Sequence, residues 1–216
     1  MVTNRQIGRV ITALRRAVRR WDVPVVERYR ADPFAALVSC LLSLRTRDDT
    51  TLPASQRLFR LARTPRTLRR LPLRAIERAI FPVGFYRTKA RTLHAVCNAL
   101  LERHGGRVPS DFDALLALPG VGRKTANLVV TVAFGQDGIC VDTHVHRISN
   151  RWGYVRTRTP EQTEQALRQR LPRRYWRSYN GLLVPFGQRM CQPVSPWCSR
   201  CPLRAVCPRI GVTHSR

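Results

Sequence analysis

The sequence lacks the long apolar segment that a membrane-spanning helix requires. No stretch of its 216 residues approaches about 20 consecutive apolar residues, and the longest apolar run, residues 126–134, is interrupted by Asn127 and Thr131. Sustained alternation of apolar and polar residues, which is typical of strands, is also missing. There is no internal repeat and no low-complexity segment. We therefore expect an all-α globular protein that has no membrane partner.

Lysine is nearly absent. Of the 39 basic residues only Lys89 and Lys124 are lysines, so 39 − 2 = 37 are arginines. The simplest explanation of this bias is compositional: arginine replaces lysine wherever a positive charge is sufficient. Arginine stays protonated and cannot act as an amine nucleophile, whereas lysine can. The two lysines are therefore the basic residues most open to a chemical role.

Acidic residues are few and unevenly placed. The 13 acids leave a net charge of 39 − 13 = +26; none precedes Asp22 and none follows Glu164. Such a surface attracts polyanions, which makes nucleic acid the expected partner. The Arg-rich start is similar to a mitochondrial transit peptide. Apolar residues at helical spacing instead indicate one face of a packed helix, formed by Ile7, Val10, Ile11, Leu14 and Val18.

Helical periodicity also covers most of the later sequence, and short links containing Gly or Pro separate the periodic stretches. We expect further helices at about residues 33–45, 49–61, 73–79, 87–104, 123–135, 143–152, 161–170 and 174–186.

The segment Leu118-Pro119-Gly120-Val121-Gly122 links two apolar helical stretches. Its two glycines allow a tight turn and expose backbone N–H groups at a helix N-terminus, where phosphate is favoured. On a strongly basic chain this pattern predicts a helix-hairpin-helix that grips the DNA backbone without reading its sequence. A plain tight turn between two core helices is the alternative.

Lys124 is expected in the first turn of the helix after this hairpin. The helix dipole and the neighbouring Arg123 both disfavour its charged form, and so act to lower the pKa of its amine. A neutral amine beside a bound phosphate backbone can attack a sugar carbon and form a Schiff base. The alternative is a lysine that only contacts phosphate, a role for which this chain otherwise uses arginine.

Asp142 lies in Val141-Asp142-Thr143-His144, another expected helix start. Local sequence indicates an N-cap. A functional interpretation is a carboxylate that faces Lys124 across a cleft and stabilises a sugar oxocarbenium ion or helps to activate the amine. The two interpretations are compatible.

Four cysteines fall within 17 residues in the pattern Cys-x6-Cys-x2-Cys-x5-Cys, interspersed with prolines. They are Cys191, Cys198, Cys201 and Cys207. Four thiols in a loop that has no hydrophobic core of its own favour a bound metal that holds the loop together over disulfide bonds. Ligand chemistry alone leaves zinc and an iron–sulfur cluster both open.

With these three motifs in this order and spacing, the sequence resembles the endonuclease III family of DNA base-excision repair glycosylases, in the helix-hairpin-helix glycosylase superfamily. The resemblance extends from Leu41-Leu42-Ser43 through Gly84-Phe85-Tyr86-x-x-Lys89-Ala90 to Cys207. It implies a six-helix barrel at residues 25–136. It also implies an iron–sulfur domain composed of residues 1–24 and 137–216, with DNA in the cleft between the lobes and the damaged nucleotide flipped out.

The resemblance further implies a bifunctional DNA glycosylase and AP lyase. Lys124 would attack the sugar C1′ and form the Schiff base, Asp142 would assist, and β-elimination would cut the strand 3′ to the abasic site. Gly120, Val121 and Gly122 would bind DNA. The cysteine quartet would ligate a structural [4Fe–4S] cluster. The expected partner is double-stranded DNA with damaged pyrimidines or abasic sites, bound by a monomer in the bacterial cytoplasm at the nucleoid.

The sequence departs from the family at one position. Arg45 occupies the place of a glutamine that, in many members, fills the gap left by the flipped base. Arginine can contact guanine O6 and N7 together, so we hypothesise a bias towards lesions opposite guanine. Phe85 matches the apolar wedge position of the family, with a core aromatic as the alternative.

Two other functions remain open at the level of sequence. A monofunctional mismatch glycosylase would release the base with water, but such relatives lack a lysine at the position of Lys124. A non-catalytic helix-hairpin-helix protein would use the hairpin only as a phosphate clamp. The spacing of Lys124 and Asp142 is evidence against this second alternative.

Overall fold

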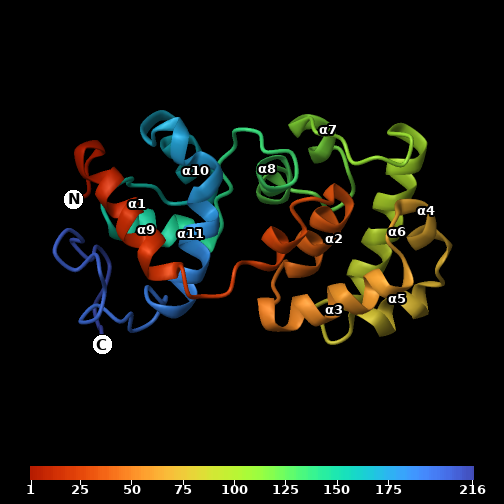
Figure 1. Cartoon of the computed structure of the whole chain (residues 1–216), viewed down its shortest axis with the longest axis horizontal. Coiled ribbons are helices and arrows are strands. Elements are labelled where there is room, and N and C mark those ends of the chain that lie inside the picture. Colours follow the sequence, from red (N-terminus) through yellow and green to blue (C-terminus); the bar gives the residue numbers. More distant parts are fainter. The chain divides into compact units, whose positions relative to one another are not determined.

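The computed structural model describes all 216 residues, and its regular elements are all helices (Figure 1). The chain forms two compact units. Unit 1 consists of Met1–Val23 and Asp137–Arg216, and unit 2 of Pro24–Gln136. No helix combines the length and the hydrophobicity needed to span a membrane. The prediction of an all-α fold is confirmed.

Unit 1 begins with α1 (Asn4–Val18). Thr3 and Gln6 form a capping box that satisfies backbone N–H groups in the first turn. The helix buries the apolar face expected from its periodicity, at Ile7, Val10, Ile11 and Leu14, while Val18 is half-buried. Each of the four buried side chains contributes about 1.5–3 kcal/mol to stability. The acid-free start of the sequence is thus part of a packed core.

The rest of unit 1 follows residue 136. Its helices are α9 (Thr143–Arg151), α10 (Pro160–Arg170), the 3-10 turn η2 (Arg173–Tyr175) and α11 (Trp176–Arg189). α11 packs against α1 and α9, and α9 also packs against α10. After α11 the chain has no further helix, and residues 190–216 form what we call the cysteine segment. Leu203 joins this segment to the core of unit 1.

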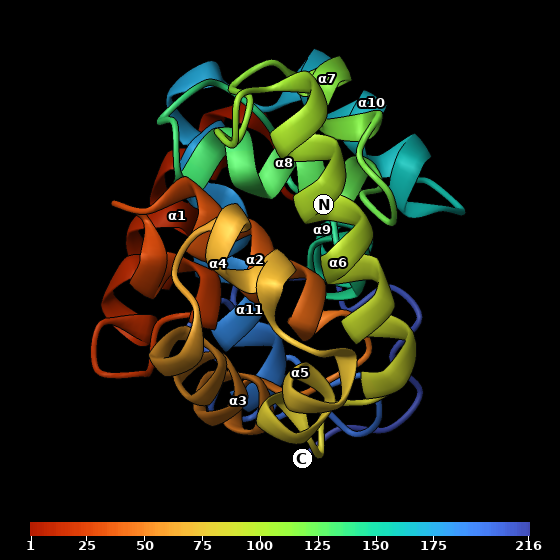
Figure 2. The same ribbon diagram turned by 90° about the vertical axis from the view of Figure 1, so that its right-hand side faces the viewer.

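Unit 2 is built around α2 (Pro33–Ser43). Its other elements are η1 (Val25–Tyr29), α3 (Asp48–Leu61), α4 (Pro65–Arg70), α5 (Leu73–Ile80), α6 (Tyr86–Arg103), α7 (Phe112–Leu116) and α8 (Arg123–Val132). Every residue from Phe34 to Leu42 is buried, because this helix is apolar on all sides and packs against η1, α3, α6 and α8. Figure 2 shows the neighbouring α3 and α5, which also pack against each other.

The helices differ from expectation chiefly at the ends of α8 and α11 and in two short elements. α11 spans Trp176–Arg189 rather than residues 174–186. α8 ends at Val132 rather than near residue 135, because Gly135 takes φ +63° and the Gln136 N–H bonds to the Val130 carbonyl at 3.0 Å, which closes the helix. α4 and α7 were not expected. They have six and five residues, which is too short to show a helical period.

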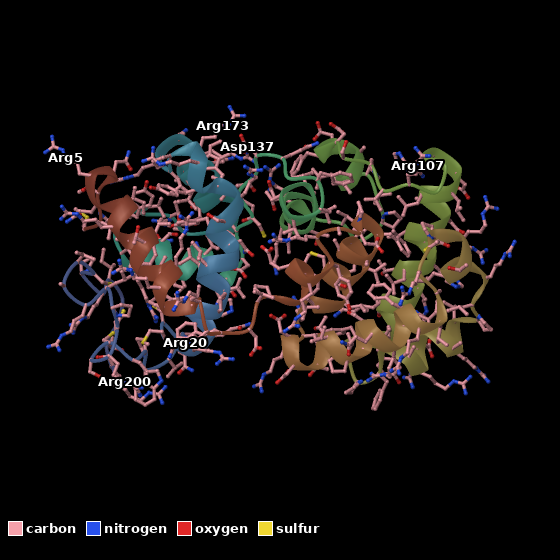
Figure 3. All side chains as sticks on the ribbon, viewed as in Figure 1. Arg5, Arg20, Arg107, Asp137, Arg173 and Arg200 are labelled. Carbon is pink, nitrogen blue, oxygen red and sulfur yellow. The ribbon has the colours of Figure 1, made fainter.

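Arginine side chains extend from the surfaces of both units (Figure 3). Arg5, Arg20 and Arg200 of unit 1 and Arg107 of unit 2 are exposed. Arg173 differs from these four in having an acidic neighbour, because its Nε lies 2.6 Å from Asp137 Oδ2. Since 13 acids cannot neutralise 39 bases, most of this charge remains uncompensated and available to a polyanion.

Candidate functional site

The two hairpin glycines between α7 and α8 are required for different reasons. Gly120 has φ +72°, and a Cβ there would lie 2.7 Å from Thr92 Cγ2 of α6. Gly122 is the N-cap of α8, has φ −96° and has open space where a Cβ would be. Gly120 therefore allows the turn to form against α6, whereas Gly122 leaves the N-terminus of α8 open to a ligand.

Lys124 lies in the first turn of α8 and is half-buried. It is close to α2, where its charge lowers the pKa of the buried Cys40 thiol and so opposes the larger upward effect of burial. The preceding Arg123 places its guanidinium carbon 5.1 Å from the ring centroid of Phe112, on α7. The hairpin residues and Lys124 are thus brought together at one helix start, as the sequence predicted.

Asp142 is the N-cap of α9. Its Oδ1 accepts hydrogen bonds from the N–H groups of His144 at 2.9 Å and Val145 at 2.8 Å. Both bonds use the same carboxylate oxygen, and the side chain is half-exposed. The capping interpretation is therefore confirmed. Asp142 belongs to unit 1 and Lys124 to unit 2.

Arg45 and Phe85, the two expected DNA-contacting side chains of unit 2, lie side by side. The guanidinium carbon of Arg45 is 5.9 Å from the centroid of the Phe85 ring. Arg45 lies between α2 and α3, and Phe85 is the N-cap of α6. Phe85 is 63% exposed, which excludes the alternative of a core aromatic. A basic and an aromatic side chain therefore form one exposed pair.

The four cysteines of the cysteine segment line one pocket with Trp152, Phe186 and Trp197. All four thiols are free and half-buried. Burial raises the pKa of Cys201 to about 11, and the other three thiols add to the rise because they lie nearby. No three His, Cys, Asp or Glu side chains are placed to hold one metal ion. The structure thus gathers the quartet around one shared pocket.

Two arginines of α9 that sequence analysis overlooked, the buried Arg151 and the half-buried Arg147, support this pocket. Arg147 donates to the Cys191 carbonyl at 2.8 Å and the Gly187 carbonyl at 3.2 Å. Arg151 donates to the Cys191 Sγ at 3.4 Å and to the carbonyls of Gln192 and Pro193 at 2.6 and 2.7 Å. Their spacing of four residues places both on one helix face, and that spacing was the available signal.

The fold and these motifs can be compared with known proteins. The family model for the HhH-GPD superfamily of base excision DNA repair proteins matches residues 38–173, more than half of the chain. The chain belongs to this superfamily. It is 49% identical over 176 residues to endonuclease III of Thermotoga maritima (strain ATCC 43589 / DSM 3109 / JCM 10099 / NBRC 100826 / MSB8), covering 82% of this chain and 83% of that protein.

Solved structures of this superfamily agree with that assignment. A trapped endonuclease III–DNA covalent intermediate and a non-covalent endonuclease III–DNA complex each match with a TM-score of 0.87 and 36% identity, covering 97% of both chains. The resemblance to the endonuclease III family is thus confirmed. Within the superfamily, the chain is an endonuclease III homologue.

Proposed function

We propose that this DNA glycosylase and AP lyase of base excision repair removes damaged pyrimidines from double-stranded DNA and cuts the strand 3′ to the resulting abasic site, acting as a monomer. The observation that carries the proposal is the placement of Lys124. It is one of only two lysines in the chain and lies in the first turn of α8, directly after the open N-cap Gly122. A bound phosphate backbone would therefore pass close to its amine.

In the proposed reaction the neutral Lys124 amine attacks C1′ of the damaged nucleotide. The C1′–N bond breaks, the base leaves with the bonding electrons and is protonated, and the sugar ring opens to a Schiff base with Lys124. Loss of a proton from C2′ then expels the 3′ phosphate by β-elimination. Hydrolysis of the remaining imine returns the free amine.

Asp142 is proposed to assist this reaction through its negative charge. A carboxylate near C1′ stabilises the oxocarbenium character that develops as the base departs. The N-cap bonds hold the carboxylate through Oδ1, so that its orientation is fixed before the substrate binds.

DNA binding is proposed to begin at the hairpin residues Gly120, Val121 and Gly122, where the open N-terminus of α8 favours a phosphate without reading sequence. The net charge of +26 adds a field that depends strongly on salt. The logarithm of affinity should fall with the logarithm of salt concentration, with a slope of about −0.9 per phosphate neutralised.

We further propose that the cysteine quartet holds a [4Fe–4S] cluster, which members of the endonuclease III family generally carry. The four cysteines line one pocket. Four thiols around a shared space suit a cluster, in which each thiolate binds a different iron. Bound there, the cluster would supply structural support rather than redox chemistry.

Borohydride trapping on duplex DNA with an abasic site tests the proposed function. Reduction of the Schiff base should yield a covalent protein–DNA adduct, and Lys124→Ala should abolish it while DNA binding persists. Base release by the wild type without any adduct would instead support a monofunctional glycosylase. Binding with neither base release nor adduct would support the non-catalytic alternative.

A further inference from the structure

The second lysine of the chain, Lys89, is the buried cation of unit 2. It lies on α6, and its Nζ donates to the carbonyls of Leu42 at 2.7 Å and Leu44 at 2.5 Å and to Thr46 Oγ1 at 3.1 Å. Burial lowers the pKa of Lys89 to about 8, so the ammonium form with three N–H donors predominates at neutral pH. All three donors thus meet oxygens of the segment that contains Arg45.

The backbone of Lys89 contacts Phe85, the second residue of the exposed Arg45–Phe85 pair. Its N–H bonds to the Phe85 carbonyl at 3.0 Å. Thr46 Oγ1, which accepts from Lys89, also accepts from the Gly84 N–H at 3.2 Å. Lys89 therefore touches residue 85 through its main chain and residues 42–46 through its side chain.

The two loops approach each other so closely at Gly84 that a side chain there would be tightly packed. A Cβ on Gly84 would lie 3.1 Å from the Arg45 carbonyl oxygen and 3.3 Å from Thr46 Oγ1. Arg45 and Phe85 both have the left-handed backbone conformation, with φ of +53° and +58°. For residues with a side chain this conformation is strained and persists only where the surrounding contacts enforce it.

The shape of the Lys89 site explains why arginine does not occupy it. Three oxygens around one point suit a compact tetrahedral ammonium, whereas a planar guanidinium is larger and directs its donors outward in one plane. In a chain with 37 arginines, we attribute the lysine at this position to the arrangement of the three oxygens around it.

We propose that Lys89 is a positioning residue, which locks the Arg45 loop onto the Phe85 loop so that both side chains can enter a DNA duplex together. This inference rests on the proposed function, because it assumes that the pair fills the gap left by a flipped nucleotide. Lys89 itself does not reach the reacting atoms. Its loss should therefore matter only where a duplex has to be held open.

The test compares AP-lyase cleavage of an abasic site in duplex DNA and in single-stranded DNA, using Lys89→Met. On duplex DNA we expect kcat/KM to fall by about tenfold or more, because a displaced loop misorients the substrate. On single-stranded DNA, which has no partner strand to hold open, the rate should stay near that of wild type. Equal losses on both substrates, or no loss on duplex DNA, would overturn the proposal.

Two further variants make this test robust to a folding defect. Thr46→Val removes one of the three acceptors and the bridge to Gly84, and should give a smaller loss that is again confined to duplex DNA. Arg91→Met removes one exposed charge from the same helix and should leave the ratio of duplex to single-strand rates unchanged. A shift in that ratio with Arg91→Met equal to that with Lys89→Met would contradict the proposal.

A binding measurement separates this inference from the proposed function. The fluorescence of 2-aminopurine placed opposite a stable abasic analogue rises when the orphaned base loses its stacking. Wild type should cause this rise and Lys89→Met should cause a smaller one, whether or not either protein cleaves DNA. An absent adduct would refute the lyase proposal, whereas an equal fluorescence rise in both proteins would refute the role of Lys89.

Discussion

The guanidinium of Arg45 lies 5.9 Å from the ring of Phe85, although 40 residues separate them in the sequence. Both side chains extend from backbones in the strained left-handed conformation, which costs of order 1–3 kcal/mol for each residue. A folded protein retains such strain where its surroundings enforce it. The structure therefore places a hydrogen-bonding group and a stacking group next to each other at the surface of unit 2.

The first prediction concerns the base opposite the lesion. Arg45 can donate two hydrogen bonds to guanine O6 and N7, a contact that contributes about 1–3 kcal/mol of discrimination. Wild type should therefore act fastest opposite guanine, and Arg45→Gln should reduce that preference by about tenfold. Single-turnover excision rates for one lesion placed opposite each of the four bases measure this preference.

Arg47→Gln provides the matched control for this prediction. Arg47 is exposed in the same loop and has a structural role through its carbonyl, which accepts from Thr51 at 2.9 Å. Arg47→Gln should leave the preference for the opposite base unchanged and alter only the overall affinity for DNA. An identical profile in wild type and Arg45→Gln would eliminate guanine readout by Arg45.

The second prediction separates the two roles of Asp142. Asparagine caps a helix about as well as aspartate, so Asp142→Asn should keep the stability of unit 1 while removing the negative charge. Its glycosylase rate should fall by about 100-fold or more, in line with other electrostatic catalytic groups. Single-turnover base release and urea unfolding, measured on the same preparations, test the two halves of the prediction.

Asp142→Ala completes the comparison. It removes the cap as well as the charge and should destabilise the protein by a further ~1 kcal/mol relative to Asp142→Asn. If Asp142→Asn releases base at the wild-type rate, the carboxylate acts only as a cap.

Local sequence was sufficient to predict features that depend on neighbours along the chain. The apolar face of α1, the glycines of the hairpin and the capping position of Asp142 are determined within a few residues, and the structure bears out each of them. The short helices α4 and α7 were missed because five or six residues do not establish a period.

Features that depend on distant contacts could not be predicted in this way. The scarcity of lysine singled out Lys89, but its oxygen acceptors lie 43 to 47 residues earlier in the chain. The bonds from Arg147 to the Cys191 carbonyl likewise span 44 residues. Periodicity identifies which face is buried, but not which polar groups meet there.

The third prediction distinguishes the two hairpin glycines. Gly120→Ala places a side chain at φ +72° and against Thr92, and should destabilise the protein by at least ~1 kcal/mol. Thr92→Ala should recover only the steric part of that loss, because the backbone strain remains. Thermal or urea unfolding of the single and double variants measures both effects.

Gly122→Ala should behave in the opposite way. A Cβ there meets nothing within 4 Å, so the fold should tolerate it. The added methyl group would lie where a phosphate approaches the start of α8, so DNA affinity should fall several-fold, while stability should fall by less than ~1 kcal/mol because alanine is a poorer N-cap than glycine. Equal DNA affinity in wild type and Gly122→Ala would show that phosphate does not bind at this helix start.

The last prediction concerns Arg151, which contacts the cysteine segment through one thiol and two carbonyls. Arg151→Met removes these charge-assisted bonds, each of which contributes about 1.5–3 kcal/mol, and so loosens the backbone around Cys191. Iron bound per chain should fall, and a chelator should remove the remainder faster than from wild type. Arg156→Met, which removes an exposed charge in the same unit, is the control and should retain iron fully. Because iron content is measured directly, the result does not depend on catalysis, and full retention by Arg151→Met would show that the thiols hold the proposed cluster without this support.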